Sequence, residues 1–428
     1  MLVEEAGKTT VVAIDMGYGH LRPAHALAAY LGTEVFECDK PPLAGVEEQA
    51  TWARTRRFYE AVSRLSTTLS AFRGLLDAIT DIPHLHPRRD LSEPTAGAQG
   101  LSWLVERGLG RGLASYLDER GGSLLTTFYA PAIAADVLGK APVHCVVTDS
   151  DVNRVWAPLD GARSRIQFFA PSRRCVRRLE AYGVRPENIR YTGFPLPDEL
   201  VGGRDRTILR KNLAARLVRL DPRERFIGPL RADIERRIGR LPRDERPPLV
   251  TFAVGGAGAQ AELADRFLPS LREPLAKGKL RLALVAGIRT EVAARFRAAL
   301  ARAGVDGVTI LLEPDVPSYI RAFNALLAET DVLWTKPSEM TFFAALGLPI
   351  VLSAPVGVHE GYNRRWAIEA GAGFAQGDAR VASGWLGEWI ADGTLAGAAW
   401  SGALRLPSLG LYEIAEATMS PPSRAALY

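Results

Sequence analysis

The sequence predicts an α/β protein with two doubly wound domains, each built on a parallel sheet covered by helices. An apolar, β-branched run that leads into a glycine-bearing turn and a helical pattern occurs twice, first in TTVVAIDMGYGHLRPAHALAAYL and again in LVTFAVGGAGAQ. After each start, short apolar runs alternate with helix-length segments, which is the order of strands and helices around a parallel sheet. The 428 residues are also enough for two cores of ordinary size.

The first domain is expected over residues 1–203. Its strands are predicted from the apolar runs TTVVAIDM, EVFECD, VHCVVT and IQFFA, with helices between them. The interval 45–120 has a different character, because it is mainly helical and combines aromatic with arginine side chains, namely Trp52, Arg54, Arg56, Arg57, Phe58, Tyr59, Arg64, Phe72 and Arg73. This combination favours a surface that meets a membrane or an acceptor, although a lid or a dimer interface would have the same composition.

The second domain is expected over residues 246–395, after a basic linker or insertion at 204–245. That segment is dense in arginine and interrupted by Gly and Pro, which is typical of a solvated connection rather than of a core. The strands of the second domain are predicted from PPLVTFAV, RLALVAG, VTILLE, DVLWTK and PIVLSAP. Residues 396–428 contain no clear strand and are expected to pack helices back onto the body.

Composition and charge exclude several classes of protein. Hydrophobic residues make up 47% of the chain and charged residues 24%, as in folded, water-soluble proteins. The three cysteines have no metal-ligand spacing, so we expect neither a disulfide framework nor a metal site. The net charge of +5 suits an anionic membrane or phosphate-bearing substrates, but no nucleic-acid-binding pattern accompanies it. A cytoplasmic location is expected, with peripheral attachment to the inner face of the membrane as an alternative.

The first motif, GYGH, lies between the first strand and the first helix. Gly17 and Gly19 allow a ligand to approach the backbone closely, and the helix start offers N–H groups to anionic or hydroxyl-bearing groups. His20 is therefore a candidate proton acceptor. The alternative is that His20 merely caps the helix.

The second motif is Thr148-Asp149-Ser150-Asp151, at the end of a predicted strand. Carboxylates at this end of a parallel sheet point toward the ligand crevice, where one of them can accept a proton or orient an imidazole. Asp149 is the better candidate. A helix N-cap at Asp149 or Asp151 is the alternative.

The third motif is the glycine run Gly255, Gly256 and Gly258 after the strand LVTFAV. Such a turn suits a pyrophosphate held at the start of the next helix. The run does not match the dinucleotide-binding pattern, and by itself it is weak, because tight turns use glycine whether or not they bind phosphate.

The fourth motif is the long run DVLWTKPSEMTFFAALGLPIVLSAPVGVHEGYNRRWAIEAGAG, residues 331–373, and it is the most specific. Together with GYGH, VVTDSDVNRVW, IRYTGFPLP and FAVGGAG in the same order, it resembles the glycosyltransferases that make diacylglycerol glycolipids. The lipid-linked N-acetylglucosaminyltransferase of peptidoglycan synthesis is a more distant relative of that group. The resemblance covers both domains, but neither the interval 45–120 nor the segment 204–248.

The resemblance implies a GT-B fold, in which two Rossmann-like domains face each other across a cleft. It also implies a UDP-sugar donor as co-substrate with no further cofactor, inversion at the anomeric carbon without a metal ion, and a hydroxyl acceptor carried by a lipid at a membrane surface. By position, it makes His20 the candidate general base or acceptor contact and Asp149 its supporting acid. Gly17, Gly19, Asp151 and Asn153 fall on the acceptor side.

The same resemblance assigns the donor side to the second domain. The glycines of the third motif would line the diphosphate, the TKP sequence opens the donor loop, and the residues around position 360 lie near the donor sugar. The full set is Gly255, Gly256, Gly258, Ala286, Gly287, Arg289, Thr335, Lys336, Pro337, Ser338, Glu339, His359, Glu360 and Asn363.

Two departures from the family pattern concern the donor and acceptor sides. Phe342 stands where the family has the glutamate that grips the ribose hydroxyls, and Glu339, one helical turn earlier, is the expected substitute. Asn153 stands where the family's first domain has a histidine.

Inverting sugar transfer is therefore the leading prediction. A nucleotide-sugar epimerase or hydrolase on the same scaffold is an alternative, because a fold does not fix its chemistry. A binding or scaffold protein that has lost the donor chemistry is a third reading, supported by Phe342 and Asn153. The residues that oppose it are His20, Asp149, Glu360 and Asn363.

Overall fold

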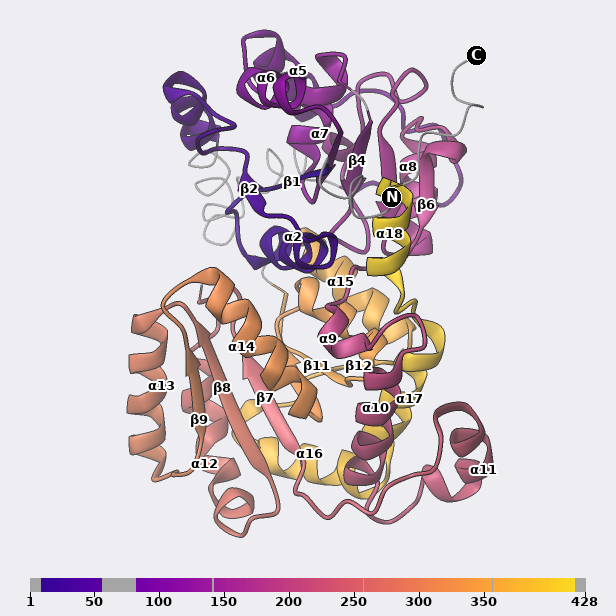
Figure 1. Cartoon of the computed structure of the whole chain (residues 1–428). Helices are drawn as coiled ribbons and strands as arrows, with labels where there is room; N and C mark the ends of the chain where they lie inside the picture. The colour runs from indigo at the N-terminus through magenta and orange to yellow at the C-terminus, as the bar shows by residue number, and fades with distance from the viewer. Residues whose placement is uncertain (1–8, 56–81, 141, 257, 356, 420–428) are drawn as a thin grey trace. The chain divides into compact units, whose positions relative to one another are not determined.

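The computed structural model describes residues 9–55, 82–140, 142–256, 258–355 and 357–419. The chain forms two compact units. The first comprises the residues up to 195, then 356–362 and the chain from 409 onward, and the second comprises 196–355 and 363–408. Figure 1 shows a sheet with flanking helices in each unit.

The first unit is built on a six-stranded parallel sheet in the order β2-β1-β3-β4-β5-β6. The strands are β1 (Thr9–Ala13), β2 (Val35–Glu37), β3 (Ser123–Thr126), β4 (Val143–Val146), β5 (Gln167–Ala170) and β6 (Ile189–Tyr191). The four runs predicted from the sequence are β1, β2, β4 and β5, so these strands are confirmed. All five residues of β1 are buried, as expected of a strand with both faces covered.

The helices of the first unit follow the strands along the chain. They are α2 (Tyr18–Leu31), α5 (Ala96–Glu106), α6 (Arg111–Arg120), α7 (Tyr129–Val137), α8 (Arg173–Ala181) and α18 (Gly410–Met419), with 3₁₀ turns η2 (Arg154–Trp156) and η3 (Pro186–Asn188). The chain returns at its far end, because α18 packs on α2 and Tyr412 meets Tyr30 with ring centroids 5.3 Å apart.

The interval 45–120 is helical only in part. Residues 46–55, α5 and α6 are helical, 82–94 are irregular, and 56–81 lie outside the described residues together with most of the aromatic and arginine side chains expected there. Trp52 does not contribute to a surface, because it is 5% exposed and belongs to the apolar core of the first unit.

The second unit has a second six-stranded parallel sheet, in the order β12-β11-β10-β7-β8-β9. The strands are β7 (Leu249–Ala253), β8 (Arg281–Gly287), β9 (Thr309–Leu312), β10 (Val332–Thr335), β11 (Ile350–Leu352) and β12 (Gly373–Ala375). The first five coincide with the runs predicted from the sequence, which are confirmed.

Helices accompany these strands in the second unit. They are α9 (Asp198–Val201), α10 (Thr207–Leu220), α11 (Ile227–Ile238), α12 (Leu263–Ala276), α13 (Thr290–Ala303), α14 (Val316–Glu329), α15 (Val358–Glu369), α16 (Ala382–Ala391) and α17 (Thr394–Arg405), with 3₁₀ helices η4 (Glu339–Leu346) and η5 (Ala379–Val381). Helix α15 begins in the stretch that belongs to the first unit.

The basic segment 204–245 differs from the linker expected there. Helix α10 packs against α17, and two of its arginines are buried. Arg216 donates from Nη1 to the carbonyls of Leu346 and Gly347, each at 3.0 Å, and from Nε to that of Thr330. The linker prediction rested on composition, which does not reveal that an arginine can be turned inward to satisfy carbonyls at the ends of other elements.

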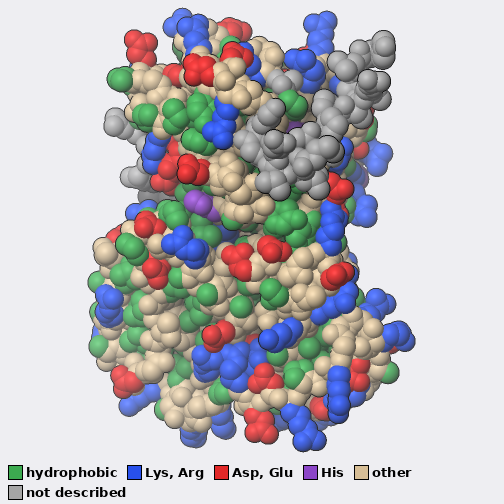
Figure 2. All heavy atoms as spheres, in the orientation of Figure 1, with side chains coloured by type: hydrophobic (Ala, Val, Ile, Leu, Met, Phe, Trp, Pro, Cys, Tyr) green, Lys and Arg blue, Asp and Glu red, His purple; other side chains and the backbone are tan. Residues whose placement is uncertain are grey.

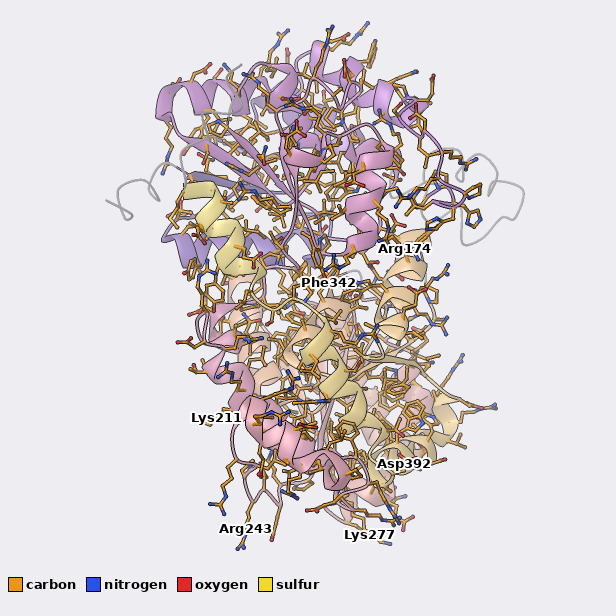
Figure 3. The ribbon with its side chains drawn as sticks, turned by 90° about the vertical axis from the view of Figure 1, so that its right-hand side faces the viewer. Arg174, Lys211, Arg243, Lys277, Phe342 and Asp392 are labelled. Carbon is orange, nitrogen blue, oxygen red and sulfur yellow. The ribbon has the colours of Figure 1, made fainter. Side chains whose placement is uncertain are left out.

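Other basic side chains of this segment meet solvent. Lys211 and Arg243 are exposed and project outward in Figure 3. On the face drawn in Figure 2, Lys and Arg side chains lie interspersed with Asp and Glu. This mixture is typical of a solvated surface.

The strand orders place one reversal point in each sheet. In the first unit, β1 has β2 on one side and β3 on the other; in the second, β7 lies between β8 and β10. The strands that follow β1 along the chain are thus added first on one side of it and then on the other, and the same holds for β7. The reversal points lie between β1 and β3 and between β7 and β10. In open α/β sheets, ligands bind outside the carboxyl ends of the strands at such points.

Candidate functional site

The reversal point of the first unit holds His20. Its strand β1 ends at Ala13, and Gly17 precedes α2 with φ 110°, a conformation that favours glycine. The chain can therefore turn sharply and place His20 in the first turn of the helix. Nδ1 of His20 lies 2.8 Å from the carbonyl oxygen of Thr127, just after β3, and 3.3 Å from Oγ1 of Thr148, just after β4.

Aromatic rings surround the half-buried imidazole of His20. Phe128 meets it edge-on with centroids 4.9 Å apart, and the ring of Trp156 lies at 6.3 Å. Edge-on and tilted packing of this kind restricts the ring without satisfying its nitrogens. Neither Thr127 nor Trp156 was singled out as a site residue from the sequence, and the three-dimensional adjacency of β1, β3 and β4 is the signal that identifies them.

The two aspartates of the second motif have different surroundings. Asp151 is fully buried and receives two hydrogen bonds from Arg178, Nε to Oδ1 at 2.8 Å and Nη2 to Oδ2 at 3.0 Å. Burial lowers the pKa of Arg178, but the hydrogen bonds and charge of Asp151 outweigh it and raise that pKa. Asp149 is only half-buried. The carboxylate that remains more accessible at this strand end is therefore Asp149.

Asn153 lies at the start of η2 without capping it through its side chain. Its Oδ1 is buried and has no hydrogen-bond partner among the described residues. The roles predicted for Asp149, Asp151 and Asn153 toward an acceptor stay predictions.

The reversal point of the second unit holds Gly255 and Lys336. Adjacent strands β7 and β10 carry them, and Thr335 joins the two strand ends by donating from Oγ1 to the carbonyl of Ala253 at 3.0 Å. The Lys336 side chain lies directly over Gly255, because a Cβ at that glycine would fall 2.5 Å from Cε of Lys336. The chain thus places a lysine stem against a bare backbone at the position where an α/β sheet receives its ligand.

The glycine run closes a turn of its own. The N–H of Gly258 donates to the carbonyl of Gly255 at 2.7 Å. Helix α12 starts only at Leu263, so the turn itself, rather than the helix start predicted from the sequence, lies next to the strand end. Arg289, which follows β8 and Gly287, donates from Nε to the carbonyl of Gly256 at 2.8 Å. Ala286 and Gly287 are buried at the end of β8.

Gln260 ties this turn to β11 and was not predicted from the sequence. It has a left-handed backbone, φ 70°, which is uncommon for a residue with a side chain. Its Nε2 donates to the carbonyl of Ala354 at 2.7 Å, and its Oε1 accepts a hydrogen bond from Ser353. The signal that identifies Gln260 is its positive φ, which the sequence does not reveal.

The donor loop after β10 continues into η4. Ser338 caps η4, accepting from the N–H of Met340, and Glu339, the first residue of η4, is 7% exposed. Asn363 of α15 donates from Nδ2 to the carbonyl of Pro337 at 3.3 Å. The structure therefore brings Lys336, Pro337, Ser338 and Asn363 together around one loop.

Phe342, the residue at the place of the family's glutamate, is buried against Trp366 with ring centroids 4.9 Å apart. It is a packing residue of the second unit. His359 and Glu360 occupy the first turn of α15, one helical turn before Asn363. Glu360 is buried and His359 half-buried. The predicted contacts of Glu339, His359 and Glu360 with a donor stay predictions.

The described part of the chain lacks two features that would indicate a metal ion or a membrane span. No group of His, Cys, Asp and Glu side chains within it has the arrangement of a metal site. None of its helices has the length and apolar character to span a bilayer.

The strand orders and the site define a class of protein with two Rossmann-like domains. When the strands of the second domain are numbered from its first strand, β7, their order is 3-2-1-4-5-6, which is typical of nucleotide binding. Among solved structures, the chain is similar to a protein from Listeria monocytogenes assigned as a UDP-N-acetylglucosamine 2-epimerase, with 12% identity over 95% of this chain and 94% of that one and a TM-score of 0.52. It is also similar to MurG from Acinetobacter baumannii, with 14% identity over 96% and 98% of the chains and a TM-score of 0.50. These similarities show the GT-B fold.

Sequence comparisons add little to this class. A model described as a domain of unknown function, DUF6938, matches residues 288–380. No curated protein matches the chain in sequence. The resemblance to the diacylglycerol glycosyltransferases stays a prediction.

Proposed function

We propose that the protein uses a UDP-sugar and transfers its sugar to a hydroxyl acceptor with inversion. The observation that carries the proposal is the placement of Lys336 over Gly255 at the reversal point of the second sheet. A bare glycine backbone allows a diphosphate to approach, and an ammonium group there counters its charge. Arg289, anchored on the carbonyl of Gly256, adds a second cation on the same turn.

The proposed transfer forms one bond at the anomeric carbon and breaks another. The acceptor oxygen forms a bond to the anomeric carbon while its proton passes to His20. The bond from the anomeric carbon to the diphosphate oxygen breaks, and its electron pair leaves with the nucleoside diphosphate. Lys336 and Arg289 stabilise that leaving group electrostatically, as preorganised cations do in phosphate-releasing enzymes. Glu339 is the proposed contact for the ribose hydroxyls. It substitutes for the family's glutamate, whose position is occupied by Phe342 in this chain.

Epimerisation of a UDP-sugar, or its hydrolysis, is the second candidate function. The similarity to the Listeria monocytogenes protein supports it, because that protein is assigned to a UDP-N-acetylglucosamine 2-epimerase activity. Product analysis separates the readings: transfer yields a glycosylated acceptor, epimerisation yields an isomeric UDP-sugar, and hydrolysis yields free sugar with UDP.

A lipid acceptor, and with it attachment to an anionic membrane, remains part of the proposal. Among the described residues, Trp103 of α5 supports it, because it is 51% exposed and Arg107 lies over its ring at 4.1 Å. An exposed tryptophan beside an arginine suits the interface between lipid headgroups and tails. Sedimentation with neutral and anionic vesicles tests this part, and binding to neither would favour a soluble acceptor.

Thermal unfolding with a panel of nucleoside diphosphates and their sugar conjugates tests the donor site. A ligand held only by the folded protein at 100 times its Kd stabilises it by about 2.7 kcal/mol, so UDP or a UDP-sugar is expected to raise Tm. Lys336→Ala should weaken binding by at least tenfold, whereas Lys277→Ala should not, because Lys277 is an exposed residue directly after α12 and is paired with Glu273. Absence of a shift with every member of the panel at millimolar concentration would contradict the proposal.

A further inference from the structure

His20 and Thr127 are joined by a reciprocal pair of hydrogen bonds. Nδ1 of His20 meets the carbonyl of Thr127 at 2.8 Å, and Oγ1 of Thr127 donates to the carbonyl of His20 at 2.8 Å. Each side chain thus binds the backbone of the other residue. The first turn of α2 is thereby fastened to the chain that leaves β3.

We propose that Thr127 and Thr148 are positioning residues that fix the neutral imidazole of His20 in the Nδ1–H tautomer, so that Nε2 is the nitrogen that takes up a proton. The tautomer does not depend on the proposed function. Its use, to remove the acceptor's proton, rests on that function.

The tautomer follows from the chemistry of the partners. A backbone carbonyl has no proton to give, so at 2.8 Å Nδ1 must be the donor. The alternative places the nitrogen lone pair against the carbonyl lone pairs at hydrogen-bond distance, which is repulsive. Thr148 Oγ1, at 3.3 Å, then accepts the longer branch of the same N–H.

The carbonyl of Thr127 is itself held in place. Oγ1 of Thr126, one residue earlier, accepts a hydrogen bond from the N–H of Phe128 and donates one to the carbonyl of Phe128, at 3.2 Å each. Thr126, Thr127 and Thr148 are all buried, so water does not compete for these groups. A buried acceptor with a fixed direction selects the tautomer and the ring orientation, as second-sphere partners do for metal-bound histidines.

The support proposed here comes from Thr127 and Thr148, whereas the support predicted from the sequence comes from Asp149. In the carboxylate-supported form, removal of the carboxylate would release the tautomer. In the form proposed here, the backbone carbonyl fixes it, and no substitution at Asp149 removes that carbonyl. The two forms therefore differ in a measurable way.

Nitrogen-15 spectra of the histidine rings, recorded on the full chain without ligand, provide the test. Long-range proton–nitrogen correlations identify which ring nitrogen carries the proton, and His20→Gln identifies the His20 signals among the six histidines. At a pH where the His20 ring is neutral, the protonated-type signal is expected on Nδ1 and the unprotonated type on Nε2. The reverse assignment would overturn the proposal.

Variants separate the two sources of support. Asp149→Ala should leave the Nδ1–H tautomer in place, and its loss in this variant would overturn the inference. Thr148→Val keeps the shape and removes the second acceptor, so the Nδ1 proton resonance should shift, and Thr148→Ser should restore it. An unchanged resonance in Thr148→Val would show that Thr148 is not a positioning residue. If Thr148→Val does not fold, the spectra of the wild type and of Asp149→Ala still test whether the Thr127 carbonyl fixes the tautomer.

The outcomes are distinguishable from those of the proposed function. A confirmed Nδ1–H tautomer together with no sugar transfer to any acceptor would contradict the transferase proposal alone. Nucleotide binding that depends on Lys336, together with the opposite tautomer, would contradict this inference alone.

Discussion

Two glycines of the candidate site are required for different physical reasons. Gly17 has φ 110°, and a Cβ there would lie more than 4 Å from every atom of the residues that the structure describes, so its requirement is conformational. Gly255 has no such backbone constraint, but a Cβ there would collide with Lys336. The two positions were predicted from the same pattern, a glycine after a strand, and the pattern does not distinguish a strained backbone from a close approach.

Gly255→Ala is expected to displace Lys336 and to weaken UDP binding at least tenfold, because the new methyl group occupies the place of the lysine stem. Isothermal titration measures the loss. The matched control is Gly387→Ala in α16, where a Cβ would meet none of the described residues within 4 Å. It should bind UDP normally and gain about 0.5–1 kcal/mol of stability, since alanine is the better helix former. Equal affinity in Gly255→Ala and the wild type would contradict the placement of the diphosphate.

His144 makes the folded state sensitive to acid. Burial, followed by the charge of Arg190, lowers its pKa to about 4, and no group in the described part of the chain forms a hydrogen bond with its Nδ1. In the unfolded chain the pKa is about 6.5. Between these values the unfolded state binds a proton that the folded state does not, so the free energy of unfolding falls as the pH falls from 6.5 to 4, by about 3 kcal/mol in total.

His144→Leu should remove this part of the pH dependence, measured by urea unfolding at a series of pH values. The control is the same measurement on His86→Gln, a variant at an exposed histidine. A wild-type slope in His144→Leu would mean that other groups cause the acid sensitivity.

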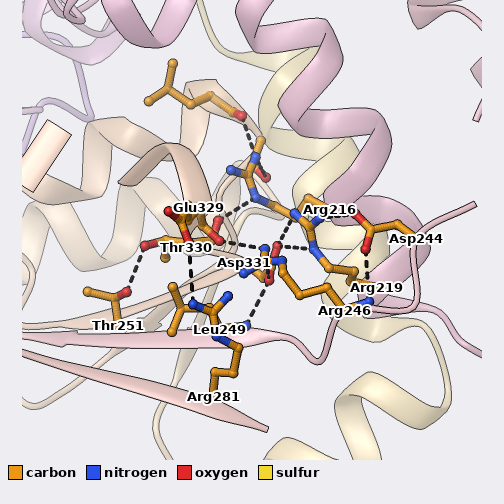
Figure 4. Close-up of polar contacts among 12 residues, drawn as sticks. Arg216, Arg219, Asp244, Arg246, Leu249, Thr251, Arg281, Glu329, Thr330 and Asp331 are labelled. Carbon is orange, nitrogen blue, oxygen red and sulfur yellow. Dashed lines mark hydrogen bonds and ion pairs between the residues drawn. The ribbon is translucent and has the colours of Figure 1, made fainter. Parts of the chain in front are cut away.

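At the scale of elements, a buried ion network joins α10 and the segment before β7 to the start of β10. Asp331 accepts from Nη2 of Arg219 at 2.7 Å, from Nη2 of Arg246 at 3.0 Å and from the N–H of Leu249 at 2.8 Å, and Arg219 also pairs with Asp244 (Figure 4). These contacts explain why an arginine-rich stretch is part of a core. Burial lowers the pKa of the neighbouring Arg216 to about 10.

Asp331→Ala should destabilise the protein by about 3–5 kcal/mol, because it leaves two arginines near the core without their shared carboxylate. The free energy of unfolding in urea measures this. Glu273→Ala removes the pair with Lys277, which is exposed to solvent, and should change the free energy of unfolding much less than Asp331→Ala does. Similar losses in the two variants would show that the buried network has no special weight.

Nine strands were predictable because each is a short, strongly apolar run. The other three were not predicted. Strand β3, Ser123–Thr126, is buried and lies inside its sheet, but only two of its four residues are apolar. Two strands at sheet edges have little buried surface: β12, Gly-Phe-Ala, is three residues long with one residue exposed, and β6 has no buried residue. Such edge strands are held by the backbone of their neighbours rather than by their own side chains. The inward turn of Arg216 and the left-handed Gln260 were equally unpredictable, since each depends on carbonyls more than ninety residues away in the chain.

At the scale of the whole molecule, the two sheets share a construction and differ in strand order. The first unit runs 2-1-3-4-5-6 and the second 3-2-1-4-5-6, counted within each unit. The sequence predicted both parallel sheets and the positions of His20, Gly255 and Lys336 after strands. It did not predict that Thr127 and Thr148 meet His20, because that contact depends on the order of strands in the sheet.

The first unit is assembled from three separate stretches of chain, the last of which contributes α18. Gly410, where α18 begins, approaches the backbone of Phe194 so closely that a Cβ would lie 2.6 Å from its carbonyl oxygen. During synthesis, the whole second unit therefore emerges from the ribosome before the first unit receives its closing helix. The first unit is therefore synthesised first but completes its fold last. Until α18 is made, Tyr412 does not cover the face of α2 around Tyr30.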